Sequence, residues 1–200
     1  MTTKFNVKPK STQESIVKLD HKSHILKLSD TYIGSTDKTT EEIWYYDETS
    51  QKIVKGLKTF IPGEYKIYDE IVVNAFDQFI RTFEAKECQH RVKNIKINID
   101  KESGEISVKN DGEGIRVEMH EKEQVYIPEL IFGHLLTSSN YDQSKIKHVG
   151  GRNGYGAKLT NIFSTMFYLE TIDANMGKKF KQTFYDNMSR KDKPSITKNS

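Results

Sequence analysis

The sequence predicts a single α+β domain, and three observations lead to this prediction. The chain has 200 residues, 35% of them hydrophobic, which is enough for one domain with a core and too few for two comfortable ones. Residues 64–83 repeat apolar side chains at helical spacing. Residues 95–99, 106–108, 166–172 and 179–185 show strand-like patterns. These helices and strands alternate without an internal repeat or a long low-complexity linker.

Composition excludes several classes of protein. The single cysteine, Cys88, excludes a disulfide framework and a zinc-finger ligand set, and the first residues contain no apolar run typical of a signal peptide. No stretch approaches the roughly twenty apolar residues that a membrane span requires. The formal net charge of +3 lacks the strongly basic footprint of a dedicated DNA-binding domain. We therefore expect an intracellular protein with no membrane partner, in which other segments would hold any DNA substrate.

Both ends of the chain are polar. Residues 1–15 are rich in Lys, Thr and Ser, and the last twelve residues, SRKDKPSITKNS, are similar. We expect residues 1–23 to form a polar arm, residues 24–190 to form the folded domain, and residues 191–200 to form a poorly packed tail. The aromatic run Trp44-Tyr45-Tyr46 is expected to pack in the core.

A helix is expected from Glu64 to about Phe83, after a Pro62-Gly63 turn. Its apolar residues cover most of its circumference at about 100° per residue, so we expect it to be largely buried. These residues are Ile67, Ile71, Val72, Ala75, Phe76, Phe79, Ile80 and Phe83.

A narrow polar stripe of Glu70, Asn74, Asp77 and Arg81 remains on this helix. A carboxylate buried without partners costs several kcal/mol, so the stripe requires cations, water or a ligand. The alternative is a structural ion pair between Asp77 and Arg81.

The strands at 95–99 and 106–108 read as a β-hairpin that turns at residues 101–104 and delivers Asn110, Asp111 and Gly112 at its end. The run Asp111-Gly112-Glu113-Gly114 can also be an ordinary turn. Pro128 then begins a short apolar helix through Leu136, which leads into a polar loop.

The segment HVGGRNGYGAKLTNIFS resembles a glycine-rich loop that feeds a helix, an arrangement that suits a bound phosphate. A Walker A loop is rejected because Ala157 precedes Lys158 and Leu159 replaces the hydroxyl residue. A Rossmann pattern fails because Leu159 stands where a third glycine or alanine belongs. By itself, such a segment can equally be a flexible surface loop.

Together, E-x-x-x-N on a helix, then D-x-G-x-G, then a glycine-rich lid resemble the GHKL ATPase superfamily. The longer strings YKIYDEIVVNAFDQ, KNDGEGI, VYIPELIFGHLLTSSNYD and GGRNGYGAKLTNIFST look like the type II DNA topoisomerases of eukaryotes and large DNA viruses. The resemblance runs from about His24 to Met188. It implies a two-layer α+β GHKL (Bergerat) fold, in which a mixed β-sheet carries helices on one face. Leu28-Ser29 and His148 depart from the family's usual residues.

The resemblance implies a role for each matching residue, with ATP and Mg²⁺ as cofactors. Glu70 would be the general base that activates the attacking water. Asn74 would coordinate Mg²⁺, and Gln78 would be a secondary nucleotide contact. Asp111 would accept a hydrogen bond from the adenine amino group, and glycines would let the chain pass close to the base. These glycines are Gly112 and Gly114.

The polar loop and the glycine-rich lid would hold the rest of the nucleotide. Ribose and phosphate would contact Ser138, Ser139 and Asn140. The triphosphate would be wrapped by backbone groups of the lid, where Lys158 adds positive charge. The lid residues are Gly151, Arg152, Asn153, Gly154, Tyr155, Gly156, Ala157 and Lys158.

The function implied is ATP binding and hydrolysis that closes a dimeric gate, coupled to passage of one DNA duplex through a double-strand break in another. The partners implied are a second copy of the chain, reached by the N-terminal arm, and DNA in the full-length enzyme, which we expect to be nuclear, or in a virion or cytoplasmic viral factory. A lysine from a following transducer domain would complete the site, so we expect this chain alone to turn over little ATP. The alternatives are a non-hydrolysing, nucleotide-gated dimerisation module and another GHKL ATPase, such as a mismatch-repair protein.

Overall fold

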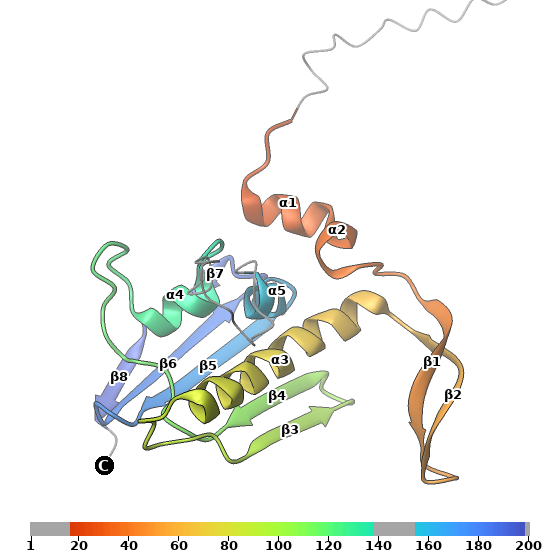
Figure 1. Cartoon of the computed structure of the whole chain (residues 1–200). Coiled ribbons are helices and arrows are strands. Elements are labelled where there is room, and N and C mark those ends of the chain that lie inside the picture. Colours follow the sequence, from red (N-terminus) through yellow and green to blue (C-terminus); the bar gives the residue numbers. More distant parts are fainter. Residues whose placement is uncertain (1–16, 138–154, 199–200) are drawn as a thin grey trace, which may run out of the picture.

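The computed structural model describes residues 17–137 and 155–198, which form helices and antiparallel strands in the order shown in Figure 1. No helix within these ranges is long and apolar enough to cross a membrane. The helices are α1 (His21–Lys27), α2 (Ser29–Ile33), α3 (Pro62–Glu84), α4 (Ile127–Gly133) and α5 (Gly156–Ile162). The strands are β1 (Thr39–Asp47), β2 (Lys52–Phe60), β3 (Ile95–Asp100), β4 (Glu105–Asn110), β5 (Met166–Asp173), β6 (Lys178–Tyr185), β7 (Arg190–Lys191) and β8 (Ser195–Lys198).

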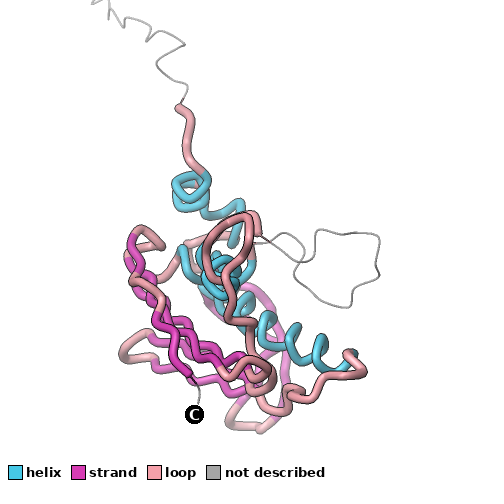
Figure 2. Tube along the Cα trace, turned by 90° about the vertical axis from the view of Figure 1, so that its left-hand side faces the viewer, coloured by secondary structure: helices cyan, strands magenta, loops and turns pink. Residues whose placement is uncertain are grey.

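Helices and strands separate into two layers. Figure 2 shows the strands of the main body on one side and the helices on the other, and Figure 1 shows α3, α4 and α5 lying across the strands. The predicted two-layer α+β class is therefore confirmed. The described strands pair only antiparallel, as β1 with β2, β3 with β4, and β6 with β5, β7 and β8, so the parallel pairing expected of a mixed sheet is absent among them.

Helix α3 confirms the long helix predicted from the apolar spacing, but its expected burial is wrong. Pro62 occupies the first turn, where a missing N–H costs nothing. The helix contacts α5 and β4, while a third face remains in solvent. On that face Phe76 is 52% exposed and Phe83 is 63% exposed. Apolar spacing showed that the helix was rich in apolar side chains, but not how many of its faces would be covered.

Strands β1 and β2 form a hairpin that stands away from the main body (Figure 1). Positions 42, 44 and 46 pair with positions 57, 55 and 53, so their side chains share one face. Trp44 and Tyr46 on that face are 68% and 60% exposed, which contradicts the core packing expected for this aromatic run. The hairpin has its own cross-strand contacts, such as Thr40 Oγ1 to Thr59 Oγ1 at 2.8 Å.

The core consists of two clusters. One joins the N-terminal helices to α5 through Ile25, Ile33, Leu159 and Ile162. Asp20 caps α1, because its side chain accepts a hydrogen bond from Ser23 N at 3.1 Å. The other cluster joins the loop after β4 to β5 and β6; it contains Val117, Leu169 and Phe180.

The residues after 190 are not the poorly packed tail that their polarity suggested. Arg190 and Lys191 pair with the end of β6, and Ser195–Lys198 pairs with its beginning, placing Ile196 opposite Phe180. Unpaired N–H and C=O groups along β6 provide the physical reason, since an available sheet edge pairs with any extended segment that reaches it. Composition alone cannot reveal such a partner.

Candidate functional site

Helices α3 and α5 meet at Gly156, the first residue of α5. A Cβ atom built on Gly156 would lie 2.6 Å from Glu70 Oε2 and 3.3 Å from Asn74 Nδ2. One turn along α5, Thr160 Oγ1 donates to the Ile67 carbonyl at 2.8 Å. The structure therefore brings two residues of the polar stripe of α3, Glu70 and Asn74, against the first residue of α5.

Glu70 and Asn74 are held in fixed orientations on α3. Glu70 Oε1 pairs with Lys66 Nζ at 2.7 Å, and this hydrogen bond is the main cause that raises the pKa of Lys66. The Asn74 amide Nδ2 donates to the Glu70 carbonyl at 2.7 Å. Glu70 Oε2 is then the carboxylate oxygen that faces Gly156, and Asn74 Oδ1 is the amide oxygen that a cation would use.

Farther along α3, Asp77 is 6% exposed. Arg81 Nη1 donates to Gln78 Oε1 at 2.8 Å. Gln78 thus lies one turn beyond Asn74, with its amide oxygen oriented by a cation. Its role as a secondary nucleotide contact stays a prediction.

Lys158 is the most deeply buried cation of the site. It is 4% exposed, its Nζ donates to the Thr137 carbonyl at 2.7 Å, and burial lowers its pKa to about 8. Ala157 beside it is also buried, at 5% exposed. Tyr155 joins the site to the N-terminal helices, with its hydroxyl 3.1 Å from His21 Nε2.

Asp111 uses its carboxylate within the fold. Oδ1 accepts from Lys93 N at 2.6 Å and Asn94 N at 3.0 Å, and Oδ2 accepts from Asn94 Nδ2 at 2.8 Å. Hydrogen bonds from the Asn94 side chain and from both backbone amides lower the pKa of Asp111 to about 2. The acceptor predicted for adenine therefore clamps the turn before β3 to the end of β4.

Asn110 is a candidate that sequence reasoning missed. It lies opposite Ile95 in the register, so it shares the face of β4 that carries Val108. Both residues are partly covered, whereas Lys109 between them is exposed, and α3 contacts this strand. The spacing could have revealed this, because D-x-G-x-G counted back from Gly112 and Gly114 begins at 110.

The two glycines of this motif let the loop after β4 pack closely against other segments of the same chain. Gly112 has φ +107°, and a Cβ there would lie 2.8 Å from Val92 Cγ2. Gly114 has φ +70°, and a Cβ there would lie 1.9 Å from the Ile172 carbonyl oxygen. Thr171, which sequence reasoning also missed, accepts from Ile115 N at 2.9 Å. The loop is therefore fixed on β5, an arrangement that requires glycine at both positions.

Seven predicted nucleotide contacts lie outside the described residues and stay predictions. They are Ser138, Ser139, Asn140, Gly151, Arg152, Asn153 and Gly154.

The structure has a layer of helices on a layer of strands, and the polar side chains of α3 lie against the glycine at the start of α5. This fold and site are those of an ATPase domain. Residues 63–186 match the family model described as "Histidine kinase-, DNA gyrase B-, and HSP90-like ATPase". The match covers more than half of the chain, so this chain belongs to that ATPase family.

Among curated proteins, the chain is similar to proteins named DNA topoisomerase 2. It is 54% identical to that of Candida albicans over 190 residues, 95% of this chain and 12% of the relative. It is 49% identical to that of Saccharomyces cerevisiae over 193 residues, 96% of this chain and 13% of the relative. It is 46% identical to that of Acanthamoeba polyphaga mimivirus over 200 residues, 98% of this chain and 15% of the relative.

Two solved structures share the fold. The ATPase region of Saccharomyces cerevisiae topoisomerase II matches with a TM-score of 0.86 and 49% identity, over 93% of this chain and 47% of that chain. The ATPase and transducer domains of DNA topoisomerase II from Balamuthia mandrillaris match with a TM-score of 0.89 and 48% identity, over 96% of this chain and 47% of that chain. The resemblance inferred from the motifs is confirmed, and the chain spans a small part of the curated relatives that it matches.

Proposed function

We propose that this chain is the ATP-binding module of an ATP-hydrolysing type II DNA topoisomerase and binds ATP together with Mg²⁺. One observation carries the proposal: Glu70 and Asn74 both lie so close to Gly156 that a Cβ atom there would be 2.6 Å and 3.3 Å from their side chains. The candidate base, the candidate metal ligand and the end of the lid therefore meet at one point. Similarity to the ATPase regions of two topoisomerases supports the same assignment.

The donor atoms at this point fit Mg²⁺. Asn74 contributes an amide oxygen, a ligand type that Mg²⁺ accepts, and Mg²⁺ in nucleotide sites typically takes only one or two protein ligands besides phosphate oxygens and water. When bound, the ion would neutralise phosphate charge. The hydrogen bond from Asn74 Nδ2 to the Glu70 carbonyl orients Oδ1 for this role.

Glu70 would take the proton of the attacking water. Its side chain is 21% exposed, so water can reach it, and it pairs with Lys66 at 2.7 Å. Lys66 also occupies one carboxylate oxygen. The proton would therefore go to Oε2, the oxygen that faces Gly156.

Base recognition is assigned to Asn110 together with the loop that follows it. An amide can donate and accept, which matches the adenine amino group and its neighbouring ring nitrogen. Asp111 instead supports this residue, because its three hydrogen bonds fix the backbone directly after Asn110.

A homodimer formed through the β1–β2 hairpin is part of the proposal. Trp44, Tyr46, Ile53 and Leu57 on one hairpin face are 60 to 73% exposed, which is unusual for four apolar side chains in a row on a monomer. A second copy would cover this face. DNA would be held by other segments of the full-length enzyme, for which we propose a nuclear location.

Calorimetric titration of the chain with a non-hydrolysable ATP analogue and Mg²⁺ tests the proposal. We expect binding by wild type and a loss of about tenfold or more for Asn74→Ala when Mg²⁺ is present. Asn98→Ala, in the β3–β4 hairpin, is the matched control and should bind as wild type does. No binding by wild type would contradict the assignment.

A second function, nucleotide-gated dimerisation without hydrolysis, is favoured by the same exposed hairpin face. Sedimentation with and without the analogue separates the two. A chain that dimerises with the analogue but shows no turnover, even when supplied in the full-length enzyme, would be a gate only.

A further inference from the structure

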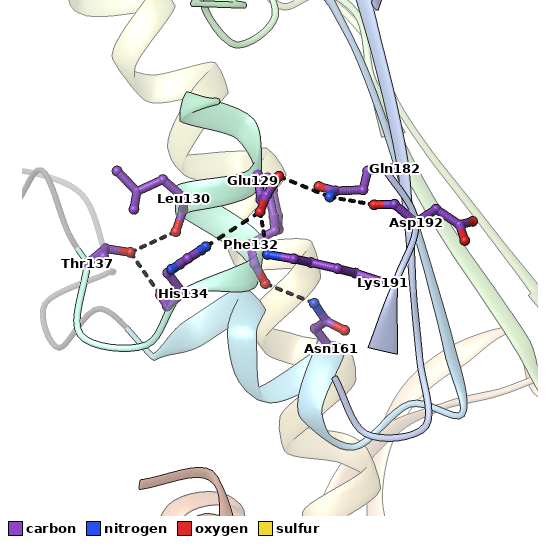
Figure 3. A network of polar contacts seen from close by, with 9 residues as sticks. All are labelled: Glu129, Leu130, Phe132, His134, Thr137, Asn161, Gln182, Lys191 and Asp192. Atoms are coloured by element: carbon purple, nitrogen blue, oxygen red, sulfur yellow. Dashed lines mark hydrogen bonds and ion pairs between the residues drawn. The ribbon is translucent and has the colours of Figure 1, made fainter. Parts of the chain in front are cut away.

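Glu129 in the first turn of α4 is a buried carboxylate that the proposed mechanism does not use. It is 4% exposed. Its Oε1 pairs with Lys191 Nζ of β7 at 2.5 Å, and its Oε2 accepts from Gln182 Nε2 of β6 at 3.0 Å. His134 Nε2 lies 3.6 Å from Oε1. Figure 3 shows these side chains converging on Glu129 from α4 and from the strands.

These contacts anchor α4 to the sheet. An ionised carboxylate at this depth is costly unless cations and donors surround it, so α4 is held where Lys191 and Gln182 can reach Glu129. Gln182 Nε2 also donates to the Asp192 carbonyl at 3.0 Å, which fixes the segment after β7. Close packing sets the depth of α4, since a Cβ on Gly133 would lie 2.6 Å from the Phe184 ring.

The other end of α4 leads to the nucleotide site. The Thr137 hydroxyl lies 2.8 Å from the Leu130 carbonyl and 2.9 Å from the His134 carbonyl, so it ties residue 137 to the end of the helix (Figure 3). The Thr137 carbonyl in turn accepts from Lys158 Nζ at 2.7 Å. The position of the Lys158 ammonium thus depends on the position of α4.

Helix α5 is tied to α4 by a second contact. Asn161 Nδ2 donates to the Phe132 carbonyl at 2.9 Å, and Asn161 is 1% exposed. A shift of α4 relative to the strands would therefore be passed to the helix that carries Lys158. Glu129 is therefore linked to Lys158 only indirectly, through α4 and Thr137.

We propose that Glu129 is a positioning residue for phosphate binding: by anchoring α4 to β6 and β7, it holds the Thr137 carbonyl that orients the Lys158 ammonium for the phosphates of a nucleoside triphosphate. This inference rests on the proposed function, because it takes the nucleotide as the ligand of Lys158. Lys191 has the same role through Glu129.

The test compares two ligands that share the base and differ in phosphate. Affinities of the chain for a non-hydrolysable ATP analogue and for adenosine are measured by calorimetry in wild type and Glu129→Gln. We expect the ATP analogue to bind about tenfold more weakly to the variant, while adenosine affinity changes less than about twofold. Glu170→Gln is the matched control, because Glu170 pairs with Lys179 at 2.7 Å on the same sheet without contacting α4. This control should leave both affinities unchanged.

A double-mutant cycle with Lys158→Met separates positioning from general loss of structure. If Glu129 acts through Lys158, Glu129→Gln should have no further effect on ATP-analogue affinity in the Lys158→Met background. An equal loss for adenosine and the ATP analogue, or an undiminished effect in that background, would overturn the inference and leave Glu129 with a role in stability alone.

Lys191→Met is the second variant, and it tests the inference even if Glu129→Gln fails to fold. It removes the cation whose side chain is 47% exposed, and it should give the same selective loss for the ATP analogue. Unchanged affinity for the analogue would contradict the inference. If wild type bound neither ligand, the proposed function would fail first, and the inference with it.

Discussion

Glu70 Oε2 lies so close to Gly156 that a single methyl group on the glycine would overlap it, at 2.6 Å. The contact joins α3 to α5 through atoms that the nucleotide would share. We predict that Gly156→Ala pushes Glu70 out of place and weakens binding of an ATP analogue at least tenfold. Gly104→Ala, at a turn with open space around it, is the control. The control should lose about 1 kcal/mol of stability from its positive φ, as measured by thermal unfolding, and bind normally.

Asp111 and Asn110 should separate stability from binding. The pKa of Asp111 is lowered to about 2, below its ordinary value of 3.8. The clamp therefore stabilises the fold above about pH 4 and loses this contribution as the pH falls toward 2. We predict that Asp111→Ala lowers the free energy of unfolding at pH 7, and that the difference from wild type shrinks in acid.

Asn110→Ala is predicted to do the opposite. It should leave the free energy of unfolding nearly unchanged and weaken binding of adenosine, as measured by calorimetry. Were Asp111→Ala to abolish adenosine binding while Asn110→Ala retained it, the original assignment of Asp111 to adenine would be restored.

Burial of Lys158 should appear in the pH dependence of stability. The pKa of Lys158 is lowered to about 8 from 10.5, so the unfolded chain binds this proton more tightly than the folded one. Stability linked to this group should therefore increase as the pH rises from about 8 to 10.5. We predict that Lys158→Met has a higher free energy of unfolding than wild type at pH 7, by on the order of 3 kcal/mol at most. Denaturant unfolding measures the difference. A variant less stable than wild type at pH 7 would show that the hydrogen bond to Thr137 outweighs the cost of burial.

The hairpin face should control self-association. We predict that Trp44→Ser together with Leu57→Ser weakens dimerisation in sedimentation experiments with an ATP analogue. Trp44 is 68% exposed and Leu57 is 73% exposed, so a second copy can bury both side chains. Thermal stability of the monomer should change little. Glu41→Ser, on the opposite hairpin face, is the control. Dimerisation equal to wild type in the double variant would place the interface elsewhere.

Local patterns predicted most of the elements, and non-local contacts decided the rest. The apolar spacing of residues 64–83 gave α3 to within two residues, and alternation gave β3 to β6, because both patterns lie within one segment. Strand β8 was missed because its partner, β6, is supplied by another part of the chain.

The candidate site shows the same division. The motifs singled out Glu70, Asn74 and Gly156 as separate nucleotide contacts, and the structure shows that they are neighbours. For adenine they pointed to Asp111, since nothing in a run of Asp-Gly-Glu-Gly tells which of two neighbouring residues shares the face of β4 that carries Val108. That answer needed the strand register, in which Asn110 lies opposite Ile95. Glu129 was not singled out, because its partners Gln182 and Lys191 are more than fifty residues away.

The pairing of Ser195–Lys198 with β6 also affects whether this strand can pair with other molecules. These four residues pair with Lys178–Lys181, the first half of β6, where Phe180 is fully buried. A chain cut after residue 194 would offer that strand to any extended peptide, including its own copies. Pairing of Ser195–Lys198 thus protects this part of β6, and its removal would leave a strand edge at which copies of the chain could misassemble.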